Sequence, residues 1–159
     1  MKYETVAVAG TFDLLHKGHK ELLSKAFEIG RTVVIGLTSK EFARKLRKPH
    51  KVEGYVTREN KLKEFLKRQN LLHRSHIVPL NDPYGPAITS QDIEALVISE
   101  RTMPRALEIN KIRQERGLKP LQIVVVNMIL AEDSKPISTT RVRRGIIDRQ
   151  GRLLSRSHF

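Results

Sequence analysis

The sequence has no cysteine among its 159 residues. It therefore has no disulfide, iron–sulfur cluster or thiolate zinc site, and a reducing compartment is permitted. The longest apolar stretches, such as 121–126, are too short to cross a bilayer. The first residues have neither the apolar core nor the cleavage site of a secretory signal. We expect a cytoplasmic protein with no membrane partner.

Acidic residues are also few, since 17 Asp and Glu stand against 30 Lys and Arg, a formal net charge of +13. Such an excess favours anionic partners, namely nucleic acid, an anionic membrane surface or phosphorylated metabolites. Aromatic residues make up only 5% of the chain, and neither an RRM nor a zinc-finger pattern appears. The shortage of stacking residues weighs against a nucleic-acid-binding module, which stays open as the weaker alternative.

Apolar runs alternate with helical patterns along the whole chain, which predicts one domain over 1–159. We expect strands over 5–9, 32–37, 75–80, 94–99 and 121–128, and helices over 17–29, 40–47, 58–68, 104–116 and 138–147. The pattern predicts a doubly wound, Rossmann-like α/β fold with a five-stranded parallel sheet flanked by helices. We expect the tail over 148–159 to form a turn or short strand, or to fray. Ligands in such folds bind at the carboxyl ends of the strands, so the loops after the first, fourth and fifth strands should carry the chemistry.

The loop after the first predicted strand reads GTFDLLHKGH. Gly10 permits a tight turn and close approach to a ligand, and Thr11 offers a hydroxyl and a backbone N–H. His16 and His19 flank Gly18 at the start of a helix, where free N–H groups and the helix dipole favour an anion. Imidazoles there can donate hydrogen bonds to phosphate oxygens. Because their ordinary pKa lies near neutrality, an anion can draw them into the protonated form.

Two other interpretations of residues 10–19, here called the histidine loop, are open. One histidine would cap the helix while the other fills the core, but a His-x-Gly-His cluster after a buried strand favours a binding role. The other is a zinc site, although no Glu lies in the pair as in HExxH and no third ligand is evident. We predict an anion site without protein ligands to a metal.

A second anion site is indicated before the last predicted helix, in the segment KPISTTRVRR. Ser138 is a natural N-cap, and the N–H groups of Thr139 and Thr140 would point toward an anion. Arg141 adds a bidentate phosphate donor. The alternative is a capped surface helix with a solvated basic face. Residues 137–140 are here called the Ser/Thr turn.

GTFD followed by HxGH resembles the nucleotidyltransferase superfamily, which also embraces class I aminoacyl-tRNA synthetases, but this chain is too short for a synthetase. The Ser/Thr turn and the residues after it resemble the ISSTxxR motif that grips the β- and γ-phosphates, with threonines where Ser–Ser is commoner. DPYGPA at 82–87, SERT at 99–102 and ERGL at 115–118 look like the archaeal phosphopantetheine adenylyltransferases and the matching domain of eukaryotic coenzyme A synthase. Bacterial enzymes with this activity usually have Thr where His16 stands.

The resemblance implies in-line attack by the phosphate of 4′-phosphopantetheine on the α-phosphorus of ATP, with Mg²⁺ held largely by phosphate oxygens and water. It implies that His16 and His19 stabilise charge that develops on the α-phosphate. The leaving pyrophosphate would be held by Ser138, Thr139 and Arg141. Catalysis would then come from positioning and charge stabilisation, with no protein nucleophile.

A lysine from 44–51 is also implied to close over the phosphates, and spacing does not separate Lys45 from Lys48. Contacts with ATP or the acceptor are implied in the histidine loop, the 82–87 loop, the end of strand four and the Ser/Thr turn. These residues are Gly10, Thr11, Phe12, Asp13, Gly18, Asp82, Tyr84, Glu100, Arg101, Ser138, Thr139 and Thr140. A cytidylyltransferase, an FAD synthetase or a nicotinamide mononucleotide adenylyltransferase would share HxGH, and these stay open as alternatives. The sequence pattern does not indicate an oligomeric state.

Overall fold

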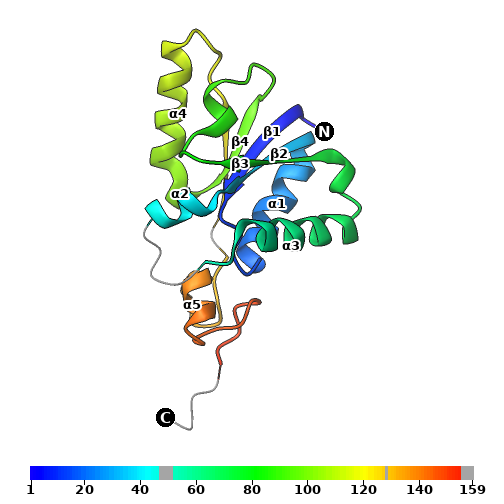
Figure 1. The fold of residues 1–159 in the computed structure, drawn as a ribbon, viewed down its shortest axis with the longest axis vertical. Coiled ribbons are helices and arrows are strands. Elements are labelled where there is room, and N and C mark those ends of the chain that lie inside the picture. The colour runs from blue at the N-terminus through cyan, green and yellow to red at the C-terminus, as the bar shows by residue number, and fades with distance from the viewer. Residues whose placement is uncertain (47–51, 128, 155–159) are drawn as a thin grey trace.

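The chain folds around a parallel sheet of five strands (Figure 1), and the computed structural model describes residues 1–46, 52–127 and 129–154. The strands are β1 (Tyr3–Gly10), β2 (Gly30–Thr38), β3 (Ser75–Leu80), β4 (Ala95–Ser99) and β5 (Gln122–Val126). Their order is β3-β2-β1-β4-β5, and every pair is parallel. The chain runs outward from β1 to β3 and then returns to the other side of β1. The predicted doubly wound α/β fold is confirmed, with the order reversing between β1 and β4.

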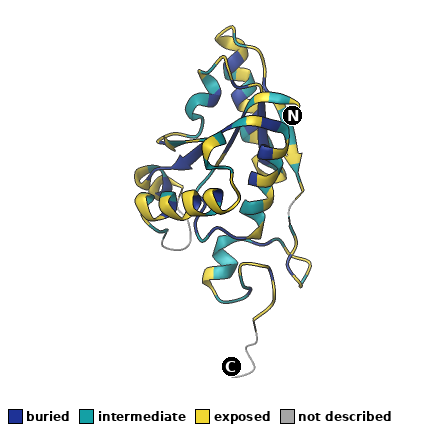
Figure 2. Cartoon of the chain, turned by 90° about the vertical axis from the view of Figure 1, so that its right-hand side faces the viewer, coloured by how far each residue is buried: buried dark blue, intermediate teal, exposed yellow. Residues whose placement is uncertain are grey.

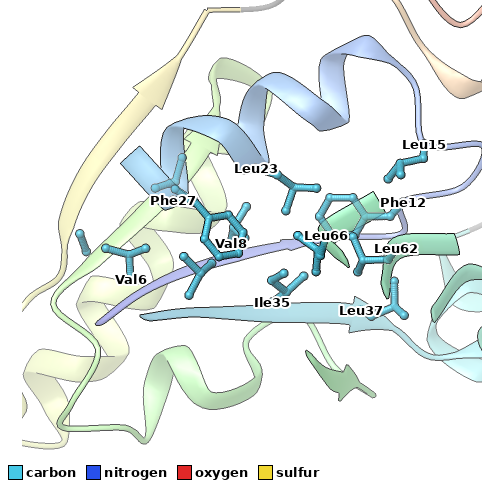
Figure 3. Close-up of a cluster of buried hydrophobic side chains, with 14 residues drawn as sticks. Val6, Val8, Phe12, Leu15, Leu23, Phe27, Ile35, Leu37, Leu62 and Leu66 are labelled. Atoms are coloured by element: carbon cyan, nitrogen blue, oxygen red, sulfur yellow. The ribbon is translucent and has the colours of Figure 1, made fainter. Parts of the chain in front are cut away.

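Helices cover both faces of the sheet. Because successive strand residues point to opposite faces, Val6 and Val8 of β1 pack beneath α1 (Lys17–Ile29) and α3 (Tyr55–Arg68). Ala7 packs instead beneath α4 (Met103–Glu115). Figure 3 shows the first of these layers, where side chains of α1 and α3 meet those of β1 and β2. The helices keep their outer faces exposed, as the yellow surfaces in Figure 2 show.

Most boundaries agree with the sequence pattern, but the last helix is shorter than predicted. Helix α5 (Thr139–Arg143) stops well before residue 147. Gly145 has a positive φ of 71°, its N–H donates to the Val142 carbonyl, and the N–H of Ile146 donates to the Arg141 carbonyl, each at 3.1 Å. This is a Schellman motif, which ends a helix at a left-handed glycine. Helix α2 (Lys40–Lys45) also differs from the predicted 40–47, of which residue 47 lies outside the described residues.

Residues 129–154 form a small lobe beyond the carboxyl end of the sheet (Figure 1). Ala131, Ile137 and Ile147 make its core. The described part of the tail, to residue 154, forms a turn that is closed by an antiparallel bridge between Ile147 and Leu153. A turn was one of the structures predicted for this tail. Among the described residues, none of the helices has the length and apolar character that crossing a membrane requires.

Candidate active site

A cavity of about 320 Å³ opens at the carboxyl ends of β1, β4 and β5. Its walls come from the histidine loop, the first turns of α1, the end of β4 and the Ser/Thr turn. A cavity of this size is within the range of small-molecule sites. Ten of the residues singled out in the sequence line it, namely Gly10, Thr11, Asp13, His16, Gly18, His19, Arg101, Ser138, Thr139 and Thr140. The two expected anion sites therefore face one cavity.

His16 and His19 cap helix α1 reciprocally. Nδ1 of His16 accepts from the N–H groups of Gly18 and His19, at 3.0 and 3.4 Å. Nδ1 of His19 accepts from the N–H of His16 at 3.1 Å. This is a capping box in which imidazoles replace the usual Ser or Thr and Glu or Gln. Capping therefore does not exclude a binding role, because it uses only one nitrogen of each ring.

The capping bonds also fix the tautomer of both rings. A backbone N–H can only donate, so each Nδ1 is an acceptor and each neutral ring carries its proton on Nε2. The rings of His16 and His19 stack with centroids 3.7 Å apart and planes 17° apart. The Phe12 ring lies against His19, with centroids 5.3 Å apart. Stacking and capping thus hold the two rings in fixed positions in the wall of the cavity.

His16 is uncharged at neutral pH. Burial lowers its pKa to about 4, and the nearby Asp13 carboxylate opposes this shift only in part. The ring is 7% exposed, and protonating Nδ1 would also break the cap. This differs from the expectation that an anion would find both imidazoles close to protonation. His16 is suited to donate a hydrogen bond as a neutral group.

We expect the free energy of unfolding to fall as the pH is lowered from about 6.5 to about 4. In that window the unfolded chain binds a proton at His16 and the folded chain does not. Stability is therefore complete above pH 6.5, and on the order of 3 kcal/mol is lost toward pH 4. Urea denaturation at a series of pH values measures the slope. His16→Asn is the matched control, because Asn caps without titrating. An equal slope in both proteins would contradict the assignment.

Gly18 is required by the packing of this turn. A Cβ at this position would lie 2.9 Å from Cε1 and 3.1 Å from Nδ1 of His16. Any side chain would push the His16 ring out of its capping position. The glycine of the HxGH motif is therefore explained by the histidine two residues before it.

Helix α5 begins with the predicted Ser138 cap and contacts the histidine loop directly. Oγ of Ser138 accepts from the N–H of Arg141 at 3.2 Å. Oγ1 of Thr139 donates to the carbonyl of Asp13 at 3.0 Å. The Ser/Thr turn and the histidine loop are thus joined by a hydrogen bond between two residues that line the cavity.

Of the arginines in this segment, Arg143 turns toward the histidine loop. It pairs with both oxygens of Asp13, at 2.8 and 3.0 Å. Arg141 donates instead to the Asp133 carboxylate and does not line the cavity. The ISSTxxR motif leaves two residues between its Thr and its Arg, so counting from Thr140 reaches Arg143. The spacing therefore assigns the arginine of the motif to Arg143, and the pyrophosphate contact predicted for Arg141 stays a prediction.

Asp13 is the buried centre of this contact, with 2% of its surface exposed. Besides Arg143, its carboxylate accepts from the N–H of Glu53 at 3.3 Å. The hydrogen bonds that Arg143 donates to Asp13 raise the pKa of the Arg143 guanidinium, so Arg143 stays charged. We predicted a ligand contact for Asp13. It lines the cavity, and its carboxylate already has these protein partners.

The histidine loop has an unusual backbone. Phe12, Leu14 and Leu15 have positive φ angles of 50°, 60° and 28°. Residues other than glycine enter this region at a cost and persist there only where their surroundings fix them. Such strain concentrates at functional sites, which agrees with the position of the loop at the cavity.

The 82–87 loop is held by its own side chains and by α4. The Asp82 carboxylate accepts from the N–H groups of Tyr84 and Gly85, each at 2.8 Å. The Tyr84 hydroxyl donates to Glu108 of α4. Neither Asp82 nor Tyr84 lines the cavity, so their predicted ligand contacts stay predictions.

The other predicted residues lie elsewhere. Phe12 is buried in the core and does not line the cavity, whereas Glu100 and Lys45 are exposed and outside its lining. Lys48 lies outside the described residues. Sequence reasoning missed Asn127, which lines the cavity directly after β5. Its signal is a polar side chain at the carboxyl end of an apolar run.

The described residues offer no cluster of three His, Asp or Glu side chains that could hold a metal ion. Asp13 is the acidic residue of the cavity wall, and Arg143 engages both its oxygens. Mg²⁺ prefers several oxygen ligands and keeps much of its water. This donor set therefore does not fit a resident magnesium site within the described chain.

A family model described as cytidylyltransferase-like matches residues 7–145, which include both expected anion sites. The chain belongs to the cytidylyltransferase-like family. Curated relatives named "phosphopantetheine adenylyltransferase" extend the match over nearly the whole chain. One from Methanothermobacter thermautotrophicus is 46% identical over 155 residues, covering 98% of this chain and 92% of the relative. Another, from Methanosarcina mazei, is 48% identical over 151 residues, covering 93% and 96%.

A solved structure agrees with this placement in the cytidylyltransferase-like family. A protein of unknown function from Archaeoglobus fulgidus is 36% identical and superposes with a TM-score of 0.69, covering 77% of this chain and 88% of that one. The archaeal relatives confirm the resemblance to phosphopantetheine adenylyltransferases that the GTFD, HxGH and DPYGPA segments indicated.

Proposed function

We propose that this protein transfers an adenylyl group from ATP to 4′-phosphopantetheine and releases dephospho-coenzyme A and pyrophosphate. The observation that carries the proposal is the shared cavity, lined by two Nε2–H imidazoles on one side and the mouth of α5 on the other. The relatives named for this activity support the choice of nucleotide and acceptor. The reaction belongs to coenzyme A biosynthesis, and we expect it in the cytoplasm.

In the proposed reaction an oxygen of the acceptor phosphate attacks the α-phosphorus of ATP in line. The new P–O bond forms as the bond to the bridging oxygen breaks, and pyrophosphate leaves with that electron pair. The attacking oxygen is already anionic, so the protein need not remove a proton. His16 and His19 donate from Nε2 to the α-phosphate oxygens, where negative charge increases in the transition state. Because neither Nδ1 is protonated, the donors are neutral and held in place before the substrate arrives.

The leaving pyrophosphate is assigned to the mouth of α5. The Ser138, Thr139 and Thr140 side chains line the cavity there, and free N–H groups at a helix start favour an anion. Arg143 is joined to the histidine loop through its pair with Asp13, and Arg101 also lines the cavity. These groups supply orientation and charge stabilisation, which dominate phosphoryl-type transfer.

Magnesium would enter with the nucleotide. Mg²⁺ bound to ATP neutralises charge on the phosphates. The donor set of the cavity does not supply a protein cage for it, so we assign the ion to phosphate oxygens and water, and no step assigned here requires a protein ligand to it.

A matrix of nucleotides and acceptors tests the proposal. ATP and CTP are each offered with 4′-phosphopantetheine, FMN, nicotinamide mononucleotide and phosphocholine, and pyrophosphate release is measured with the product mass. We expect turnover with ATP and 4′-phosphopantetheine, at least tenfold above every other pair, roughly the smallest ratio that a specific site gives. A His19→Ala sample prepared in parallel controls for contaminating ATPases. Preference for CTP, or for FMN or nicotinamide mononucleotide, would overturn it.

A further inference from the structure

A buried arginine contacts the histidine loop, and the proposed reaction does not use it. Arg58, in the first turns of α3, is 1% exposed. Its Nε donates to the carbonyl of Glu53 at 2.8 Å, and its NH1 donates to the carbonyl of Thr11 at 2.9 Å. It does not line the cavity, so it reaches the site only through the backbone of the loop.

The third nitrogen of this guanidinium is buried and has no hydrogen-bond partner among the described residues. Burial lowers the pKa of Arg58, while Asp13 acts in the opposite direction. A guanidinium remains charged in a protein even so. Buried polar groups are nearly always paired, so an unpaired one that persists calls for an explanation. Replacing it by an apolar side chain would remove the unpaired nitrogen and also the bond to Thr11.

The bond to Thr11 falls at the start of the strained backbone. A trans peptide unit directs its C=O and N–H to opposite sides, so holding the Thr11 carbonyl against Arg58 turns the N–H of Phe12 the other way. Two residues further along the chain, the carbonyl of Asp13 accepts a hydrogen bond from Oγ1 of Thr139 at 3.0 Å. Arg58 and Thr139 thus hold alternate peptide units around the positive φ of Phe12.

We propose that Arg58 is a positioning residue for the reaction, which holds the histidine loop in its strained, substrate-ready conformation through the Thr11 carbonyl. The inference rests on the proposed function for its kinetic consequence only. Its buried positive charge adjoins a loop that lines the cavity, where a low dielectric strengthens its field. Arg58 therefore acts on geometry and on potential without touching the substrate.

The chain offers a matched control in Arg113. This residue of α4 is also 1% exposed, and it also donates only to carbonyls, those of Lys119, Ala87 and Ser90, at 2.7 to 2.9 Å. It packs on the other face of the sheet and does not line the cavity. Arg58→Lys and Arg113→Lys therefore make the same chemical change in two buried sites, and only the first contacts the histidine loop.

Three measurements on the full-length protein test the inference: the urea midpoint, kcat and KM for ATP, and hydrogen exchange of the amides of 11–16. We expect both variants to lose stability. Only Arg58→Lys should lower kcat, by roughly tenfold or more with little change in KM, as expected when transition-state geometry is disturbed. Only Arg58→Lys should speed exchange in the histidine loop. Should it fail to fold, Arg58→Gln, which keeps one N–H donor for Thr11, takes its place.

Equal kinetic effects in the Arg58 and Arg113 variants, or unchanged exchange of the 11–16 amides in the Arg58 variant, would overturn the inference and reduce Arg58 to a core residue. The exchange measurement needs no substrate. If the wild-type protein shows no adenylyl transfer, the proposed function fails, and the exchange result still decides whether Arg58 holds the loop.

Discussion

Replacing His19 by alanine is expected to lower kcat by roughly two orders of magnitude or more, as the loss of other oxyanion donors does, while the fold stays intact. The variant lacks the Nε2–H donor assigned to the α-phosphate. It also lacks the acceptor for the N–H of His16, which lies 3.1 Å from Nδ1 in the wild-type protein. The loss of one cap acceptor costs about 1 kcal/mol. Pyrophosphate release gives kcat, and urea denaturation gives the free energy of unfolding.

His19→Gln separates the two roles of this histidine. Glutamine is a usual residue at the third position of a capping box, so it should restore most of the lost stability without restoring an imidazole donor. We expect its kcat to stay close to that of His19→Ala. A glutamine variant with nearly wild-type turnover would remove the imidazole from the mechanism and leave His19 only as a cap.

The second large effect is expected at the pair between Asp13 and Arg143. Arg143→Met removes both charge-assisted hydrogen bonds that the buried Asp13 carboxylate accepts from Arg143, which costs about 3 kcal/mol. The Arg143 side chain is itself 27% exposed, so the cost comes from Asp13, which is 2% exposed. We expect catalysis to fall as well, because the pair holds α5 against the histidine loop. Chemical denaturation and the adenylyl-transfer rate measure the two effects.

A surface pair provides the comparison for this variant. Arg152 pairs with Asp148 four residues earlier, in the open, at 2.8 Å, and Arg152→Met should change stability by less than about 1 kcal/mol. In a double-mutant cycle, Asp13→Asn combined with Arg143→Met should cost clearly less than the sum of the single changes. Additive losses, or an Arg143→Met cost no larger than that of Arg152→Met, would show that the buried pair does not stabilise the fold.

Much of the fold could be predicted because its signals are local. Helix α1 and strand β3 have the predicted bounds, Lys17–Ile29 and Ser75–Leu80. In α1 the apolar residues recur at helical spacing between clear start and stop signals, and β3 is a short apolar run. The end of α5 was missed although its signal was present. Gly145, with its φ of 71°, is a common helix terminator, and the apolar Ile146 and Ile147 beyond it suggested that the helix continued.

The site shows the same division between local and distant signals. HxGH and the Ser/Thr turn could be found because each is contiguous in the sequence. The reciprocal histidine cap could not, since imidazoles rarely take the places of Ser and Glu in a capping box. The contact between Asp13 and Arg143 joins residues 130 positions apart and leaves no periodic trace. Arg58 is similar, because its hydrogen bond to Thr11 crosses 47 positions.

The hydrogen bond from Thr139 to Asp13 has a consequence for the order in which the molecule is completed. It unites the first loop of the chain with one of its last helices. A ribosome synthesises β1 and its loop first, but the α5 groups that hold this loop follow only after all five strands have been made. A nascent chain that ends after β4 already contains most of the buried core residues. It still lacks the Ser/Thr turn, which lines the cavity in the complete protein.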